Sequence, residues 1–268
     1  MNPATIAAVI VVVLAAGFLA LWWYQERILF QPPRKYGEPT AEGRVDYTAS
    51  DGKSLTGYVV GDPRIAKGFL LCFHGNADLA MWQIEWAQVL HLRTGYFVFL
   101  AEYRGYMSLA GSPTYATTKL DALAAYECVR SSIGDRISRI AYFGHSLGSA
   151  VAAELAEVHP PDALLLQSPF SSARDMARII VTSPIALLWR LVSRIHFDTV
   201  AVVSRLDVPT AVAHGKRDRI VPFRMGLEVY EAAKIKGPLL VVDRAGHGDM
   251  VAIAGDEYWS WIATALES

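Results

Sequence analysis

Charged residues are scarce in this chain of 268 residues, and cysteines are scarcer still. Lysine, arginine, aspartate and glutamate together make up 19%, the formal net charge is −1, and the basic residues are scattered. Proteins that bind nucleic acid through its phosphates carry a basic patch, so the composition argues against that class. The two cysteines, Cys72 and Cys128, exclude a disulfide framework, and both fall in segments expected to be buried. They say nothing about the redox compartment.

The apolar residues, 53% of the chain, are concentrated first at the N-terminus. Residues 4–23 carry no charge, and a helix of about twenty residues spans the roughly 30 Å hydrocarbon core of a bilayer. Trp22, Trp23 and Tyr24 close the segment, as aromatic side chains do at membrane interfaces. A cleaved signal peptide is the competing interpretation, but a charged start and a small-residue cleavage site are both missing. We expect a single-pass anchor over residues 1–30.

The side of the membrane stays open. Positive charges flank the anchor only on its C-terminal side, at Arg27, Arg34 and Lys35, which favours a cytoplasmic domain.

Residues 31–43 are rich in proline and glycine and predict a linker. The remaining residues, 44–268, suit one large α/β domain.

Short apolar segments alternate with helical segments beyond the linker. Strands are expected at residues 44–50, 54–60, 68–73, 96–103, 139–143, 163–167, 210–214 and 239–242. Helices are expected at residues 79–92, 117–132, 147–158, 224–233 and 257–266. Asp78 is placed to cap the first of these helices, and Asp51-Gly52 predicts a hairpin between the first two strands. This order predicts an α/β fold whose mostly parallel central sheet is covered by helices on both faces.

The pentapeptide Gly144-His145-Ser146-Leu147-Gly148 lies between an expected strand and an expected helix. A serine hydroxyl is a weak nucleophile unless a base lies within hydrogen-bond distance. A sharp strand-to-helix turn presents the serine oxygen at the carboxyl end of the sheet, and flanking glycines remove side chains that would collide there. We therefore expect Ser146 to be a catalytic nucleophile; an ordinary glycine turn is the alternative.

Two later loops supply an acid and a base in the chain order Ser, Asp, His. Asp218 and His247 each follow a predicted strand, at the edge where open α/β sheets place their sites. We expect His247 to take the Ser146 proton and Asp218 to orient the imidazole and stabilise its charged form. Asp249 follows His247 too closely to reach behind the imidazole ring easily, and turn chemistry explains Asp207 and Asp243.

Acyl transfer also requires N–H donors for the oxyanion of the tetrahedral intermediate. The residue after the nucleophile, Leu147, supplies one backbone N–H. The loop after the third strand supplies the other, and we assign it to the backbone of Asn76. His74, in the same loop, is expected to pack and hydrogen-bond locally rather than transfer a proton.

With these residues in place, the chain resembles the α/β-hydrolase family over nearly everything after the linker. The matching segments are His74-Gly75-Asn76-Ala77, Tyr103-Arg104-Gly105-Tyr106, Gly144-His145-Ser146-Leu147-Gly148, Ser168-Pro169-Phe170, His214-Gly215 with Asp218, and Gly246-His247. In particular it is similar to the bud-emergence-homologue-type branch, which includes membrane-anchored lysophospholipid hydrolases and protein depalmitoylases. That branch usually has Asp and Gly where this chain has Glu102 and Met107. The resemblance implies an α/β-hydrolase fold and triad, with no metal and no organic cofactor.

An apolar insertion at about residues 171–206 precedes the strand at 210–214. Its apolar residues recur at roughly helical spacing: Met176, Ile179, Ile180, Ile185, Leu187, Leu188, Trp189, Leu191, Val192 and Ile195. We expect a helical cap over the serine, with a substrate pocket that involves His145, Met176 and Trp189. Lipid headgroups would then face Arg178, Arg190 and Arg194. The alternative is ordinary packing of the cap onto the body.

The leading hypothesis is a membrane-anchored serine hydrolase of carboxylic esters or thioesters, with a lipid or an acylated protein as substrate. Peptidases and amidases use the same triad, so amide hydrolysis stays open. A non-catalytic anchored binding protein on the same fold is another alternative. Such proteins usually lack a triad residue, and none is missing here. The oligomeric state is undetermined.

Overall fold

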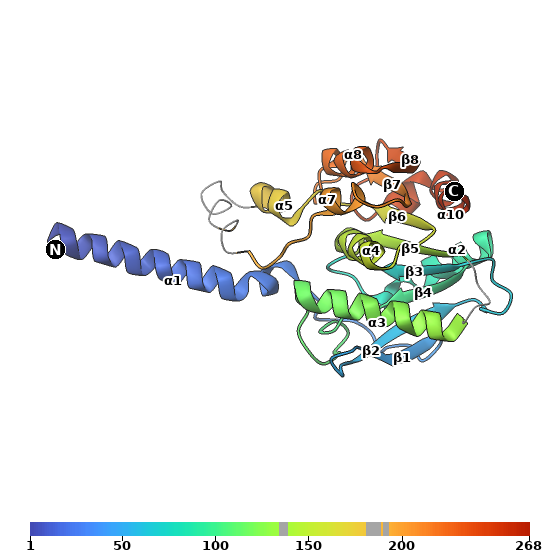
Figure 1. Cartoon of the computed structure of the whole chain (residues 1–268), viewed down its shortest axis with the longest axis horizontal. Coiled ribbons are helices and arrows are strands. Elements are labelled where there is room, and N and C mark those ends of the chain that lie inside the picture. The colour runs from blue at the N-terminus through green and yellow to red at the C-terminus, as the bar shows by residue number, and fades with distance from the viewer. Residues whose placement is uncertain (134–138, 181–188, 190–192) are drawn as a thin grey trace.

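The computed structural model describes residues 1–133, 139–180, 189 and 193–268. Figure 1 shows a long helix, α1 (Pro3–Leu29), which projects from one side of a body built of a sheet layered between helices. The strands are β1 (Arg44–Thr48), β2 (Ser54–Val60), β3 (Phe69–Phe73), β4 (Phe97–Ala101), β5 (Ile140–His145), β6 (Ala163–Gln167), β7 (Pro209–Gly215) and β8 (Ile235–Val242).

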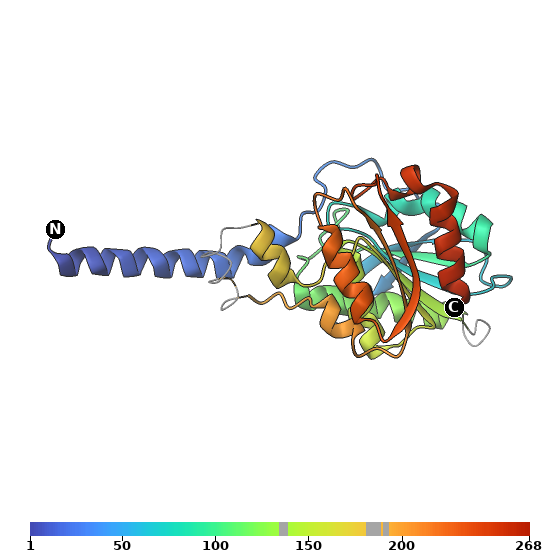
Figure 2. The same ribbon diagram turned by 90° about the horizontal axis from the view of Figure 1, so that it is seen from above.

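The helices that follow α1 alternate with these strands. They are η1 (Ala80–Gln83), α2 (Ile84–Thr94), α3 (Tyr115–Ile133), α4 (Leu147–Val158), α5 (Ala173–Ile180), α7 (Thr199–Val203), α8 (Phe223–Ala232), α9 (Met250–Ala254) and α10 (Asp256–Glu267). The helices α3, α4, α7 and α8 form a row over one face of the sheet, while α2 and α10 pack together over the other (Figure 2).

The strands form one sheet in the order β1-β2-β4-β3-β5-β6-β7-β8. The pairs β1–β2 and β2–β4 are antiparallel, and every later pair is parallel. Every residue of β3, β4 and β6 is buried, as expected for strands that carry helices on both faces. The predicted mostly parallel sheet is confirmed, and so is the hairpin at Asp51-Gly52, where Gly52 has a φ of 80°.

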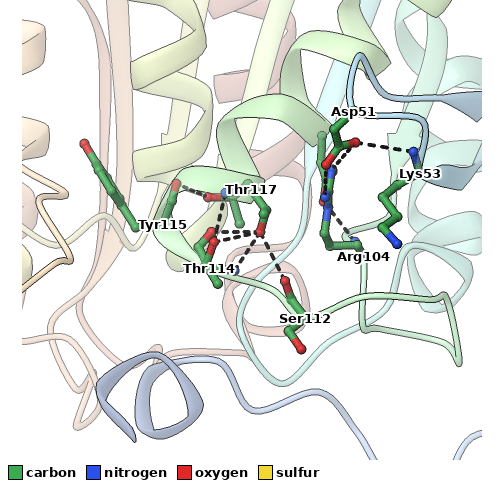
Figure 3. Close-up of polar contacts among 9 residues, drawn as sticks. Asp51, Lys53, Arg104, Ser112, Thr114, Tyr115 and Thr117 are labelled. Carbon is green, nitrogen blue, oxygen red and sulfur yellow. Dashed lines mark hydrogen bonds and ion pairs between the residues drawn. The ribbon is translucent and has the colours of Figure 1, made fainter. Parts of the chain in front are cut away.

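Side-chain bonds fix the segment between β4 and α3 (Figure 3). Arg104 donates to Asp51 of the hairpin at 2.5 Å. It also donates to Asp121 of α3 at 2.8 Å. At the start of α3, the Thr117 N–H donates to Thr114 Oγ1 at 3.0 Å, and the Thr114 N–H donates to Thr117 Oγ1 at 2.8 Å. This reciprocal pair uses backbone donors that the helix start leaves free. The loop that carries Arg104 is therefore tied to two neighbouring elements.

Three details differ from the sequence predictions. Asp78 does not cap α2, because the helical segment opens with the 3₁₀ turn η1 and the Asp78 Oδ1 accepts the N–H of Leu79, one residue before that turn. The strand β8 starts four residues earlier than predicted, since residue 235 rather than 239 pairs first with β7. The short helices α7 and α9 were not predicted, and a five-residue helix is too short to show a helical period.

Among the described residues, α1 alone is long and apolar enough to cross a membrane. Asn2 caps its start by accepting the Thr5 N–H at 2.8 Å. The predicted cap contains α5 and α7, but residues 181–188 and 190–192 lie outside the described residues, and Arg190 lies among them. Both cysteine thiols are free, Cys72 in β3 and Cys128 in α3.

Candidate active site

Ser146 occupies the turn between β5 and α4 with a φ of 53° and a ψ of −113°. Its N–H donates to the Gln167 carbonyl of β6 at 2.9 Å. A Cβ on Gly144 would lie 2.3 Å from the Gly148 carbonyl oxygen, and a Cβ on Gly148 would lie 2.0 Å from the Phe73 carbonyl oxygen. Neither position has room for a side chain. The pair of glycines in the sequence therefore has a steric cause.

Ser146, His247 and Asp218 meet at the carboxyl edge of the sheet, although three separate loops carry them. The Ser146 Oγ lies 2.9 Å from His247 Nε2, and His247 Nδ1 lies 2.7 Å from Asp218 Oδ2. When Nδ1 donates to the carboxylate, Nε2 of a neutral imidazole is the acceptor. The arrangement therefore places an unprotonated nitrogen against the serine hydroxyl.

The Asp218 carboxylate is held by several donors. Its Oδ1 accepts the N–H groups of Ile220 and Val221, each at 2.8 Å, and its Oδ2 lies 3.3 Å from His214 Nε2 as well as near His247. Burial alone would raise the pKa of Asp218, but the hydrogen bonds from His214, His247 and Val221 hold that pKa well below its usual range. The carboxylate stays charged. The sequence analysis assigned no role to His214, because its proximity to Asp218 depends on the loop geometry.

The competing aspartates each hold a local partner instead. Asp249 accepts the Gly246 N–H at 2.6 Å, Asp243 pairs with Lys216 at 2.7 Å, and Asp207 pairs with Lys234 at 3.1 Å. The geometry brings only Asp218, of the aspartates considered, to the imidazole of His247.

The loop after β3 lies beside the serine. A Cβ on Gly75 would come 3.5 Å from the Ser146 Cβ, and Asn76, Ser146 and Leu147 line the same cavity. Leu147 is the first residue of α4, where backbone N–H groups have no intrahelical acceptor and the helix dipole favours negative charge. Both expected oxyanion donors therefore lie next to the serine, and their role remains a prediction.

A buried ion pair supports the loop after β3. His74 Nε2 lies 2.7 Å from Glu102 Oε1, and His74 Nδ1 lies 2.7 Å from the Gly75 carbonyl oxygen. Both nitrogens of a protonated imidazole can donate, so these two oxygens favour the charged ring. Burial opposes that charge, but Glu102 and the Gly75 carbonyl outweigh it, and the pKa of His74 is raised. The longer Glu102 side chain, which departs from the usual Asp, reaches this imidazole directly.

His145 does not line the cavity that holds Ser146. Its Nε2 lies 3.2 Å from the His247 carbonyl oxygen, and its ring lies beside a separate small cavity next to His74 and Trp86. Burial and the neighbouring His247 lower the pKa of His145 to about 4. The ring is therefore neutral at pH 7 and adds no positive charge beside His247. The expected substrate contact of His145 has no support in this placement.

The cavity beside Ser146 has a volume of about 340 Å³ and is lined almost entirely by apolar side chains. Met176 of α5 and Trp189, which were expected to contact the substrate, are part of its lining, and that contact stays a prediction. Of the described lining residues, Gln25, Asn76 and Ser146 are polar and none is charged. A site of this kind suits an apolar ligand with one polar reacting group.

Within residues 1–133, 139–180, 189 and 193–268, no cluster of three or more His, Cys, Asp or Glu side chains is arranged to hold a metal ion. The polar groups around Ser146 are instead engaged with one another, as described above.

Known proteins with similar sequences or structures support the predicted fold. An uncharacterized protein of Mycobacterium tuberculosis is 34% identical over 254 residues, which cover 92% of this chain and 89% of that protein. The lysophosphatidylserine lipase of Danio rerio is 30% identical over 184 residues, which cover 61% of this chain. The match spans about half of that lipase, 47% of its length.

Solved structures agree with the fold at lower sequence identity. An esterase from Pyrococcus furiosus superposes with a TM-score of 0.71 at 20% identity and covers 89% of this chain and 97% of its own. The family model described as the alpha/beta hydrolase fold matches residues 68–188, which include the serine turn. The chain therefore belongs to the α/β-hydrolase family, with homology to lysophosphatidylserine lipases.

Proposed function

We propose that this chain is a membrane-anchored serine hydrolase that cleaves carboxylic esters or thioesters of apolar acyl groups. The observation that carries the proposal is the continuous contact from Ser146 Oγ to His247 Nε2 at 2.9 Å and from His247 Nδ1 to Asp218 Oδ2 at 2.7 Å. The long apolar helix α1 supports the anchor, and the relatives named lipases and esterases support the ester substrate.

The reaction follows from these positions. His247 Nε2 accepts the hydroxyl proton as Ser146 Oγ bonds to the substrate carbonyl carbon, and the backbone N–H groups of Asn76 and Leu147 stabilise the resulting oxyanion. His247 then returns the proton to the leaving alcohol or thiol, and the bond to that group breaks. Water attacks the acyl-enzyme in the same way, with His247 as base, and releases the carboxylic acid and free Ser146. Asp218 stabilises the imidazolium in both halves.

The cavity supports an acyl substrate over a peptide. Its lining offers apolar surface and no charged side chain among the described residues, so it favours a hydrocarbon chain over the polar backbone of a peptide. Sequence motifs and the lipase relatives are compatible with the lysophospholipid and depalmitoylase activities of the bud-emergence-homologue-type branch. Both esters and thioesters are therefore proposed substrates.

A hydrolysis panel tests the proposal. The full-length protein in detergent micelles is assayed on an acyl ester, the matching thioester and the matching amide, beside Ser146→Ala. We expect hydrolysis of the ester or the thioester that falls by about 10⁴-fold or more in the variant. Preferred cleavage of the amide would favour a peptidase or amidase, and no Ser146-dependent hydrolysis of any substrate by the folded protein would favour a binding protein.

A further inference from the structure

The last turns of α1 are part of the body, whereas the rest of the helix projects from it. Residues 4–20 are exposed, but Gln25 and Glu26 have exposed fractions of only 2% and 9%. The Gln25 Oε1 accepts the Arg194 N–H at 2.7 Å, and the Glu26 Oε1 accepts the Tyr115 N–H at 3.3 Å. Figures 1 and 2 both show this end of α1 reaching the body near the start of α3. The helix end is therefore fixed relative to the catalytic residues.

These same turns form a wall of the cavity that holds Ser146. Leu21, Ile28 and Leu29 line the cavity from α1, while Met176 lines it from α5. Leu21 and Ile28 are seven residues apart, and two turns of helix bring them to the same face. Leu21, Ile28 and Leu29 thus form an apolar stripe of α1 that faces the cavity, interrupted by Gln25, whose side chain also lines the cavity and bonds to the Arg194 N–H and the Trp22 carbonyl.

The stripe connects the membrane interface with the reacting serine. Leu21 lies inside the apolar part of α1, directly before Trp22, which belongs to the aromatic group expected at the membrane surface. Leu29 lies at the other end, where its carbonyl accepts a hydrogen bond of 2.5 Å from Asn76 beside Ser146. The eight residue steps between Leu21 and Leu29 cover roughly 12 Å along the helix. A hydrocarbon chain that lies along Leu21 and Ile28 would reach Ser146 within this largely apolar cavity.

We infer that α1 is a specificity-determining wall of the acyl site as well as an anchor. The substrate is a bilayer-resident amphiphile whose acyl chain lies along Ile28 and Leu21, with its carbonyl at Ser146. This inference rests on the proposed function. Because Ile28 lies nearer the serine end than Leu21, medium and long acyl chains contact Ile28 and only long chains reach Leu21. Short acyl groups contact neither residue.

Bulky substitutions on this stripe test the inference. The full-length protein, reconstituted in lipid nanodiscs, is assayed on p-nitrophenyl acetate, octanoate and palmitate. For Leu21→Trp we expect kcat/KM to fall about tenfold or more for palmitate and by less than about twofold for acetate. For Ile28→Trp we expect kcat/KM to fall for octanoate as well as for palmitate. Ile28 is 61% exposed, so the larger side chain there leaves the fold intact.

Leu19→Trp is the matched control, because Leu19 is 62% exposed and is not part of the cavity lining. It adds the same bulk to the same helix, and we expect its chain-length profile to equal that of the native protein. Unchanged profiles for both Leu21→Trp and Ile28→Trp, or equal losses for acetate and palmitate, would overturn the inference. Acetate hydrolysis that still depends on Ser146 would then leave the proposed function standing, whereas acetate hydrolysis that survives Ser146→Ala would remove the proposed function itself.

Discussion

The side chain of Asn76 joins the end of the N-terminal helix to the loop beside the nucleophile. Its Nδ2 donates to the Leu29 carbonyl at 2.5 Å, and its Oδ1 accepts the Gln31 N–H at 2.8 Å and the Tyr106 hydroxyl at 2.9 Å. The backbone N–H of Asn76 is the proposed oxyanion donor. Asn76 therefore links the position of α1 to the position of a proposed oxyanion donor.

Asn76→Ala tests this coupling. The variant keeps the backbone N–H but loses three side-chain hydrogen bonds, so we expect kcat to fall about 10- to 100-fold with little change in KM for a short ester. Tyr106→Phe removes one of the same bonds and is the graded control, with a loss of less than about fivefold. A native kcat in Asn76→Ala would show that the side chain does not position the donor.

Asp218→Asn tests the assignment of the acid. Asparagine keeps the shape but cannot hold the negative charge that orients and stabilises the His247 imidazolium, so kcat should fall about 10³- to 10⁴-fold. Asp249→Asn is the matched control, because Asp249 bonds the Gly246 N–H rather than the imidazole. The steady-state rates of both variants on a short ester decide between them. A larger loss in Asp249→Asn than in Asp218→Asn would exchange the two roles.

Glu102→Gln tests the charged state of His74. A histidine whose pKa is raised in the folded protein stabilises the fold fully below its unfolded pKa of about 6.5, and this contribution is lost as pH rises through the folded pKa. We expect the free energy of unfolding of the native protein to exceed that of Glu102→Gln by about 1–3 kcal/mol near pH 6. This difference should become smaller at alkaline pH. Urea unfolding from pH 6 to pH 9.5 measures it. A difference that does not change with pH would mean that His74 is neutral.

Gly148→Ala tests the steric account of the serine turn. The added Cβ would lie 2.0 Å from the Phe73 carbonyl oxygen, which is backbone and has no room to move aside. We expect the free energy of unfolding to fall by about 3 kcal/mol or more. Gly248→Ala is the control, since nothing lies within 4 Å of its Cβ position, and its unfolding free energy should change by less than about 0.5 kcal/mol. Equal stability of the two variants would contradict the account.

The elements of the body could be predicted because their sequence signals are local. The strands β3, β4 and β6 are short apolar runs that bury every side chain, and α4 begins and ends at the residues expected for it. The start of β8 was missed because its first residues contain Gly237 and Pro238, which are typical of loops. Pro238 is tolerated there because β8 is an edge strand, with a neighbour on one side only.

The order of the motifs in the sequence was enough to predict which three side chains meet at the site. Ser146, His247 and Asp218 follow three strands whose carboxyl ends share an edge, so a parallel sheet brings them together. The contacts of Asn76 with Leu29 and of Asp218 with His214 depend instead on loop paths and side-chain directions. No periodicity or spacing reports such contacts. For the same reason, the sequence could not predict that α1 forms a wall of the cavity.

Active-site labelling of Ser146 tests the central claim most directly. The full-length protein in detergent micelles is treated with an alkyl fluorophosphonate, digested, and mapped by mass spectrometry, with Ser146→Ala beside it. We predict one phosphonylated residue, Ser146, and loss of both the label and ester hydrolysis in the variant. A label on a different residue of the folded native protein, or ester hydrolysis at the native rate in Ser146→Ala, would contradict the account.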